Sequence, residues 1–180
     1  MKPGNVLVLP GWHGSGPGHW QTLWEQRHGY RRVEQHDWMQ PLRGDWISRL
    51  EDVVLACDER AVLVAHSLGC ILVAAWASVS RNTQRVKGAL LVAPPDTERD
   101  DLRAPLRGWA PIPLAPLPFP SIVVAGHDDP FCGFERAQAF AQAWASRFID
   151  QGRGSGHINA DSGLGSWPEG HLLLQALQQD

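Results

Sequence analysis

Short apolar runs, separated by helical patterns, limit most strongly what this chain can fold into. Strands that are apolar on both faces are typical of a parallel sheet covered by helices on its two sides. Four runs are rich in Val, Leu, Ile and Ala and span residues 5–9, 61–65, 89–93 and 122–125. Two weaker runs span residues 32–35 and 148–151. The runs therefore predict a sheet of about six strands.

Helical periodicity fills the segments between these runs. Apolar residues repeat at i, i+3 and i+4 or occur on nearly every side within residues 20–24, 46–57, 68–77, 137–148 and 172–177. Alternating strands and helices imply right-handed crossovers and a three-layer α/β/α sandwich with a doubly wound, mainly parallel sheet. No repeat or linker divides the 180 residues, so we expect one domain over 1–180. Ligands of such sheets bind at the carboxyl ends of the strands.

Composition excludes several classes of function. The formal net charge is -3 and Lys and Arg do not cluster, so we expect no nucleic-acid partner. No segment has the length or apolarity of a membrane span or signal peptide, so we expect no membrane partner. Three cysteines lie far apart, which fits a cytoplasmic location without disulfides. The eight histidines show no metal-binding spacing, and we expect neither a metal nor another cofactor.

Ser67 is the strongest candidate for a nucleophile. Among ten serines, it alone follows a convincing strand and has small residues two positions before and after it, in Ala65-His66-Ser67-Leu68-Gly69. A nucleophile elbow places the serine on a sharp, strained turn, where bulky neighbours would collide. The pentapeptide alone also fits an ordinary strand-to-helix turn. The strand before it and the buried helix after it favour the catalytic interpretation.

A serine hydroxyl needs a base within hydrogen-bond reach and an acid that orients the base. We expect His157 to be the base, because it follows the last predicted strand in a glycine-rich loop. His171 competes but falls within a predicted helix. Asp129 is the expected acid, because it follows the 122–125 strand and Pro130 pre-sets a turn behind it. Asp128 remains the alternative acid.

Catalysis also needs donors for the oxygen that becomes negative. We expect the backbone amides of Leu68 and Trp12 to form this oxyanion hole, because Leu68 follows the nucleophile and Trp12 follows the first strand. Four side chains in loops near the site are candidates to line an apolar acyl or leaving-group pocket, with a plain loop anchor as the alternative for each: His13, Trp109, Phe131 and Trp167.

Four motifs occur in order: Pro10-Gly11-Trp12 leading to Gly18-His19-Trp20-Gln21, Ala65 to Gly69, Asp129-Pro130 with Cys132, and Gly156-His157-Ile158-Asn159. With them, almost the whole chain resembles the small serine hydrolases related to retinoblastoma-binding protein 9. The resemblance implies a compact α/β-hydrolase without a cap domain. It also implies a triad at Ser67, Asp129 and His157, and esterase-like or amidase-like activity on small substrates. Ala65 departs from the general elbow, which has Gly there.

These observations lead us to expect a carboxylesterase-like serine hydrolase that cleaves a small-molecule ester or thioester through an acyl-enzyme. One alternative is an amide-cleaving or aminopeptidase-like enzyme with the same triad, which would need an acidic side chain facing the pocket. The other is a catalytically silent binding protein on the same scaffold.

The namesake of the resembling group binds the retinoblastoma protein through Leu-x-Cys-x-Glu, and this chain has Leu55-Ala56-Cys57-Asp58-Glu59. Cys57 lies on the apolar stripe of a predicted helix. Recognition of this segment would first require unravelling that helix, so we do not expect it to bind a protein.

Overall fold

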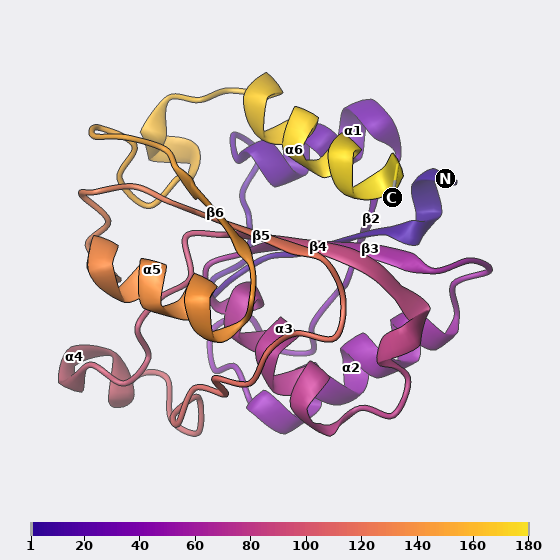
Figure 1. Ribbon diagram of the computed structural model, residues 1–180, viewed down its shortest axis with the longest axis horizontal. Coiled ribbons are helices and arrows are strands. Elements are labelled where there is room, and N and C mark those ends of the chain that lie inside the picture. Colours follow the sequence, from indigo (N-terminus) through magenta and orange to yellow (C-terminus); the bar gives the residue numbers. More distant parts are fainter. Residues whose placement is uncertain (1, 180) are drawn as a thin grey trace.

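The computed structural model describes residues 2–179 and places a six-stranded parallel sheet at the centre of the protein (Figure 1). The strands are β1 (Val6–Leu9), β2 (Arg31–Arg32), β3 (Ala61–His66), β4 (Val86–Val92), β5 (Ser121–Ala125) and β6 (Arg147–Asp150). Their order is β2-β1-β3-β4-β5-β6, and every neighbouring pair is parallel. The predicted doubly wound sheet is therefore confirmed.

Helices cover both faces of the sheet (Figure 1). One face packs against α1 (Trp20–His28) and α6 (Pro168–Gln179), and the other against α2 (Arg43–Leu55), α3 (Leu68–Val79) and α5 (Phe134–Ala143). A short α4 (Asp100–Arg103) and three 3-10 turns, η1 (Pro3–Asn5), η2 (Thr83–Arg85) and η3 (Ala160–Ser162), complete the secondary structure of residues 2–179. These layers form the expected three-layer sandwich.

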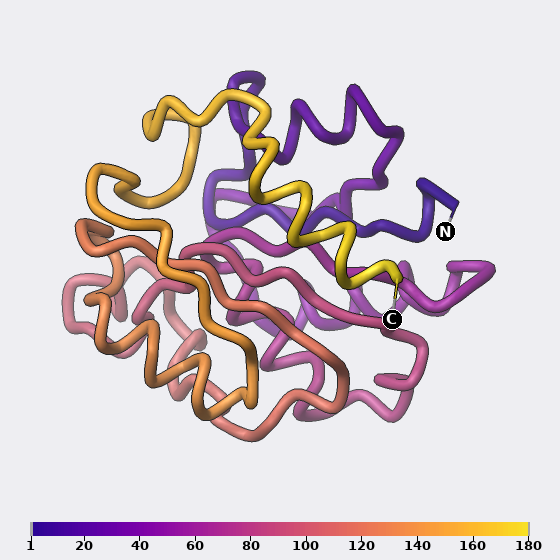
Figure 2. The backbone as a smooth tube through the Cα atoms, turned by 45° about the horizontal axis from the view of Figure 1, so that its top comes forward, coloured from indigo at the N-terminus to yellow at the C-terminus, as the bar shows by residue number. Residues whose placement is uncertain are grey.

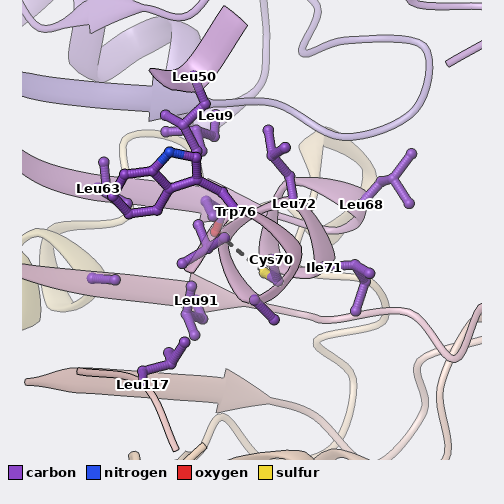
Figure 3. Close-up of a cluster of buried hydrophobic side chains, with 14 of the residues drawn as sticks. Leu9, Leu50, Leu63, Leu68, Cys70, Ile71, Leu72, Trp76, Leu91 and Leu117 are labelled. Carbon is purple, nitrogen blue, oxygen red and sulfur yellow. Dashed lines mark hydrogen bonds between the residues drawn. The ribbon is translucent and has the colours of Figure 1, made fainter. Parts of the chain in front are cut away.

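The central helix α3 is buried on almost all sides, as its apolar sequence predicts. Leu9, Leu63 and Leu91, from three different strands, lie around the part of this helix that carries Cys70 and Trp76 (Figure 3). Full burial of a leucine side chain contributes about 1.5–3 kcal/mol relative to exposure, so this contact is a main source of stability. It also fixes the start of α3, which directly follows Ser67.

The strand order reverses between β1 and β3, because β2 lies beyond β1 while β4 lies beyond β3. Ligands of doubly wound sheets bind at the carboxyl ends of the strands beside such a reversal. The segment that joins β6 to α6 runs from one edge of the sheet to the face covered by α1 (Figure 2). His157 lies in this segment.

Residues 94–120 form an irregular segment, as their eight prolines predict, and contain only α4. Leu102, Leu106 and Trp109 anchor the segment in the core. The segment therefore packs against the core as part of the same domain and forms one wall of the molecule. The expectation of a fold without a cap domain is confirmed. No helix within residues 2–179 has the length and apolarity needed to cross a bilayer.

Several sequence-based boundaries were wrong: β4 begins at Val86, before the run at 89–93, and α2 ends at Leu55, before the end of the pattern over 46–57. The run at 32–35 shares only Arg32 with β2, which pairs with β1 over Arg31 and Arg32 at the edge of the sheet. The helical pattern over 137–148 ends at Ala143, and Phe148 belongs to β6. Phe148 has apolar neighbours in either arrangement, so hydrophobic periodicity does not distinguish them.

Candidate active site

Ser67 occupies a strained turn between β3 and α3. Its backbone has φ 53° and ψ -125°, a conformation that costs energy for any residue except glycine. The surroundings impose it: the Ser67 amide donates to the carbonyl of Val92 on β4 at 2.9 Å, and its carbonyl accepts from the Cys70 amide at 2.8 Å. This is the geometry expected of a nucleophile elbow.

Close approach of β1 explains the small residues around this turn. A Cβ atom on Gly69 would lie 2.3 Å from the carbonyl oxygen of Leu9, and one on Gly11 would lie 2.7 Å from Cβ of Ser67. Both glycines are therefore required by contact between the end of β1 and the elbow. Ala65, which stands where the general elbow has Gly, is buried without disrupting the turn.

Ser67, His157 and Asp129 form one hydrogen-bonded chain. His157 Nε2 lies 2.8 Å from Ser67 Oγ, and His157 Nδ1 lies 2.9 and 2.8 Å from the two carboxylate oxygens of Asp129. A carboxylate accepts the proton of Nδ1, which leaves the lone pair on Nε2 free to accept the hydroxyl proton of Ser67. The Asp129 side chain is only 2% exposed, so water hardly competes for this contact. The structure thus brings together all three residues that the sequence singled out.

Asp128, the alternative acid, has a different environment. It is exposed, and its carboxylate accepts from the backbone amides of Gly154 and Gly156 at 3.1 and 3.3 Å. Asp128 therefore holds the loop that leads to His157 and does not contact the imidazole. His171, the alternative base, lies on α6 and hydrogen-bonds the hydroxyl of Tyr30 at 2.8 Å.

The backbone amides of Leu68 and Trp12 face no competing acceptor. Leu68 is the first residue of α3, where amides have no intrahelical partner. Within residues 2–179, neither amide donates to a protein acceptor. A Cβ atom on Gly11 would lie 3.1 Å from the Leu68 nitrogen, which puts the backbone next to Trp12 beside the start of α3. Both amides are thus available to a ligand beside Ser67.

A cavity of about 330 Å³ opens onto Ser67 and His157. Its walls come from the loops that follow β1, β3, β4, β5 and β6, as expected for a doubly wound sheet. The lining includes the apolar side chains of Trp12, Pro95, Leu102, Leu106 and Phe131, and the polar side chains of His13, His19 and Asn159. None of the described lining residues is an Asp, Glu, Lys or Arg, so no carboxylate, ammonium or guanidinium group among them faces the cavity.

Two of the four pocket candidates lie at the cavity and two do not. His13 and Phe131 line it. Trp109 is fully buried and donates to the Pro41 carbonyl at 2.9 Å, and Trp167 packs against Trp20 with ring centroids 5.1 Å apart. Placing these two tryptophans at the pocket was therefore wrong. A large apolar side chain in a loop gains more by burial in the core than by lining an open cavity.

Three polar side chains near the site were missed by sequence reasoning. His66 Nε2 lies 2.9 Å from the His157 carbonyl, and Trp20 Nε1 donates to the Ile158 carbonyl at 2.8 Å. Gln21 Nε2 donates to the carbonyls of Leu9 and Val64, which joins the ends of β1 and β3. Trp20 and Gln21 belong to the Gly18-His19-Trp20-Gln21 motif, which was the one signal that pointed to them.

Two further histidines of the site are held neutral by burial. Burial, reinforced by His157, lowers the pKa of His66 well below its usual value. Burial, with smaller contributions from His157 and Arg32, lowers the pKa of His19 from 6.5 to about 4. His19 Nδ1 accepts from the Gln21 amide and caps α1, which also requires an unprotonated nitrogen. Near neutral pH, the imidazoles around His157 therefore carry no charge.

Cysteines near the site are held as thiols. Burial, reinforced by the negative charges of Asp129 and Asp96, raises the pKa of Cys132 to about 12. Burial likewise raises the pKa of Cys70 well above its usual value. The thiolate is the reactive form, so these cysteines do not compete with Ser67 as nucleophiles. Within residues 2–179, no three His, Cys, Asp or Glu side chains are grouped to hold a metal ion.

Comparisons with known proteins identify the family and the fold of this chain. The sequence profile of the family described as serine hydrolase matches residues 6–176. The crystal structure of a protein described as a YdeN-like hydrolase, from Pectobacterium atrosepticum, has a TM-score of 0.82 and 30% identity over 96% of this chain and 90% of that chain. The ydeN product of B. subtilis has a TM-score of 0.78 and 20% identity over 97% and 98% of the two chains.

The esterase RhEst1 from Rhodococcus sp. shares the fold with a TM-score of 0.65 and 16% identity, over 96% of this chain and 90% of that chain. No curated protein sequence matches this chain significantly. The family profile nevertheless covers nearly all of its length, including every residue of the Ser67, His157 and Asp129 hydrogen-bonded chain. This protein therefore belongs to the serine hydrolase family and has the α/β-hydrolase fold.

Proposed function

We propose that this protein is a serine esterase that cleaves a small ester or thioester through an acyl-enzyme, with Ser67 as nucleophile, His157 as base and Asp129 as the acid that orients the base. The observation that carries the proposal is the continuous hydrogen-bonded chain from Ser67 Oγ through both nitrogens of His157 to the buried carboxylate of Asp129. This arrangement supports the three proposed roles.

In the first half of the reaction, Ser67 Oγ attacks the substrate carbonyl and its proton moves to His157 Nε2. The imidazolium that forms is stabilised by Asp129. Negative charge develops on the former carbonyl oxygen, and the amides of Leu68 and Trp12 donate to it. Loss of one such donor typically raises the barrier by about 3 kcal/mol. The elbow thus supplies both the nucleophile and one oxyanion donor.

In the second half, His157 returns the proton to the departing alcohol or thiol, and the acyl group remains on Ser67. A water molecule then replaces the leaving group. His157 removes a proton from this water as it attacks the acyl-enzyme. When the second tetrahedral intermediate collapses, the bond between Ser67 Oγ and the acyl carbon breaks, the acid leaves, and His157 gives the proton to Ser67 Oγ. The cycle needs no cofactor.

The described cavity lining has no Asp, Glu, Lys or Arg side chain, which supports a neutral substrate over one that carries an amine. An α-amino group in this cavity would lose hydration and gain no carboxylate partner among the described lining residues, which is unfavourable for a charge. The apolar side of the cavity, with Leu102, Leu106 and Phe131, suits a short aliphatic or aromatic acyl group. No acidic side chain among the described lining residues meets the requirement of the aminopeptidase-like alternative.

Strain at the elbow argues against a silent binding protein. A serine with positive φ costs of order 1–3 kcal/mol, and such strain persists mainly where function needs it.

Leu55 to Glu59 is likewise not a protein-binding segment in this proposal. Only Leu55 of this segment belongs to α2, which is shorter than the predicted helix. Cys57 lies just beyond α2 and is buried; its thiol donates to the Val53 carbonyl at 3.3 Å, and Arg85 donates to its carbonyl. We also propose that, within its family, this chain belongs with the small hydrolases related to retinoblastoma-binding protein 9. The four sequence motifs that occur in order along the chain support this grouping.

Hydrolysis of a graded series of p-nitrophenyl esters and matched p-nitroanilides by wild type, Ser67→Ala and Ser48→Ala tests the proposal. Ser48 is an exposed serine on α2 and serves as the matched control. We expect ester hydrolysis that falls by about 10⁴-fold or more in Ser67→Ala and is unchanged in Ser48→Ala. Equal rates in wild type and Ser67→Ala would exclude the esterase. Anilide turnover that matches ester turnover would favour the amide-cleaving alternative.

A further inference from the structure

The backbone around His157 is held in an unfavourable conformation. Ile158, the next residue, has φ 49°, and Gly156, the residue before, has φ 51°. Positive φ is accessible to glycine, but for a β-branched residue such as isoleucine it is a genuine outlier. Ile158 is also fully buried. This stretch keeps its conformation only if the surrounding structure restrains it.

Two side-chain N–H groups bind the two successive carbonyls of this stretch. Trp20 Nε1 donates to the Ile158 carbonyl at 2.8 Å, and His66 Nε2 lies 2.9 Å from the His157 carbonyl. Because a carbonyl only accepts, His66 Nε2 carries the proton of its neutral imidazole. Trp20 and His66 are 1% and 5% exposed, so water cannot replace either bond.

Both donors are anchored to the strands that carry the rest of the site. His66 is the last residue of β3 and precedes Ser67. Trp20 begins α1, and its neighbour Gln21 donates to the carbonyls of Leu9 on β1 and Val64 on β3. The base itself arrives on a loop from β6, at the far edge of the sheet. The two bonds therefore tie the loop of the base to the strand of the nucleophile.

We propose that Trp20 and His66 are positioning residues, which hold His157 Nε2 at hydrogen-bond distance from Ser67 Oγ by restraining the His157 and Ile158 carbonyls. The inference rests on the proposed esterase function. A misplacement of about 1 Å costs a reaction roughly 100-fold in rate, so partial release of this loop lowers turnover. Substrate affinity depends on the cavity walls and changes little.

Trp20→Phe tests the inference, because it removes the N–H and keeps most of the ring. Trp24→Phe is the matched control: Trp24 packs against Trp20 with ring centroids 4.7 Å apart, and its Nε1 donates at 2.6 Å to the carbonyl of Ser166, which lies beyond η3 in the same segment, near the start of α6. We expect Trp20→Phe to lower kcat about tenfold with KM unchanged. Trp24→Phe should keep kcat within about twofold of the wild-type value, and the two variants should unfold at similar urea concentrations.

A second pair of variants keeps the inference testable if Trp20→Phe does not fold. His66→Gln retains an N–H donor, and His66→Met has similar length without one. We expect His66→Gln to recover at least tenfold more kcat than His66→Met. Equal kcat in the Trp20 and Trp24 variants, or in the two His66 variants, would overturn the positioning role. Ester hydrolysis by the wild type would in that case still support the proposed esterase function. Absence of ester hydrolysis by folded wild type would instead refute the proposed function.

Discussion

At the scale of single residues, the adjacent carboxylates of Asp128 and Asp129 act on the same loop in different ways. Asp129 is buried and accepts the Nδ1 proton of His157, whereas Asp128 is exposed and binds the amides of Gly154 and Gly156. Only the first contact selects the tautomer of the base. The second sets the course of the backbone that precedes it.

This difference predicts unequal effects of the same substitution. Asp129→Asn should lower kcat by about 10⁴-fold, because an amide does not hold the imidazole in the required tautomer. Asp128→Asn keeps an acceptor oxygen for the loop amides and should lower kcat less than about tenfold. Steady-state kinetics on one activated ester measures both variants. Equal losses would contradict the assignment of Asp129 as the acid.

His19 makes stability depend on pH, because its pKa is lowered from 6.5 to about 4 in the folded protein. Between these values the unfolded chain binds the proton more readily, so stability is fully present above pH 6.5 and falls as the pH drops towards 4. The shift corresponds to about 3 kcal/mol at the acid end. Burial of the imidazole is the main physical cause.

We expect His19→Asn to weaken this dependence, since asparagine also caps a helix but does not titrate. Urea unfolding of both proteins between pH 4 and 7.5 measures it. The wild type should lose more stability than the variant over this range. His66 makes stability fall at low pH in both proteins, so its contribution cancels when the two curves are compared. Parallel curves would show that His19 is not the group responsible.

The residues that meet at the site were predictable from sequence only where their location follows from position along the chain. Ser67, Asp129 and His157 each follow a strand, and strand ends meet at one edge of a parallel sheet. Trp20 and His66 act through backbone carbonyls that lie 138 and 91 residues away. Such bonds depend on tertiary contacts, which leave no pattern in nearby sequence.

At the scale of elements, the contact between the end of β1 and the start of α3 builds the site. Gly69 lies against the Leu9 carbonyl, and Gly11 lies against Ser67. This contact also places the Leu68 amide beside the loop that carries Trp12. A larger residue at the interface would push α3 away from β1 and displace the nucleophile.

Gly69→Ala should therefore destabilise the protein by at least about 2 kcal/mol, because its Cβ would meet a backbone carbonyl that cannot move independently. Gly44→Ala, in α2 with open space around the added Cβ, is the control and should be neutral or slightly stabilising. Urea denaturation compares the two. Similar midpoints for both variants would mean that the β1 and α3 contact is not tight.

Helices and strands were predictable from sequence where most of their side chains are buried. The continuous apolar runs of β1, β3, β4 and β5 and the apolar helix α3 left little ambiguity. The edge strands β2 and β6 are short and partly exposed, so their hydrophobic signal was weaker. Boundaries also moved at β4, which begins at Val86, so strong burial predicted the presence of a strand better than its ends.

At the scale of the whole molecule, the cavity is bordered by loops and by the wall that residues 94–120 form. Leu102 and Leu106 from this wall are buried, so it is fixed to the core. The topology was predictable from the alternation of strands and helices. The cavity walls were not, because the packing of Trp109 and Trp167 into the core depends on the complete fold.

A fixed wall without a cap domain predicts an active site that stays open. The rate of hydrolysis of a short-chain ester should therefore rise smoothly with substrate concentration through its solubility limit. The measurement is the initial rate in a titration from dissolved to emulsified or micellar substrate. A sharp rise at the onset of aggregation would indicate a moving lid and contradict this description.

Covalent labelling with a fluorophosphonate probe tests most directly the claim that the hydroxyl of Ser67 is activated by His157. Intact-mass spectrometry should show one adduct per wild-type chain, and peptide mapping should place it on Ser67. Ser67→Ala should not label, and His157→Gln should label at least 100-fold more slowly. An unlabelled folded wild type, or an adduct that persists in Ser67→Ala, would contradict the account.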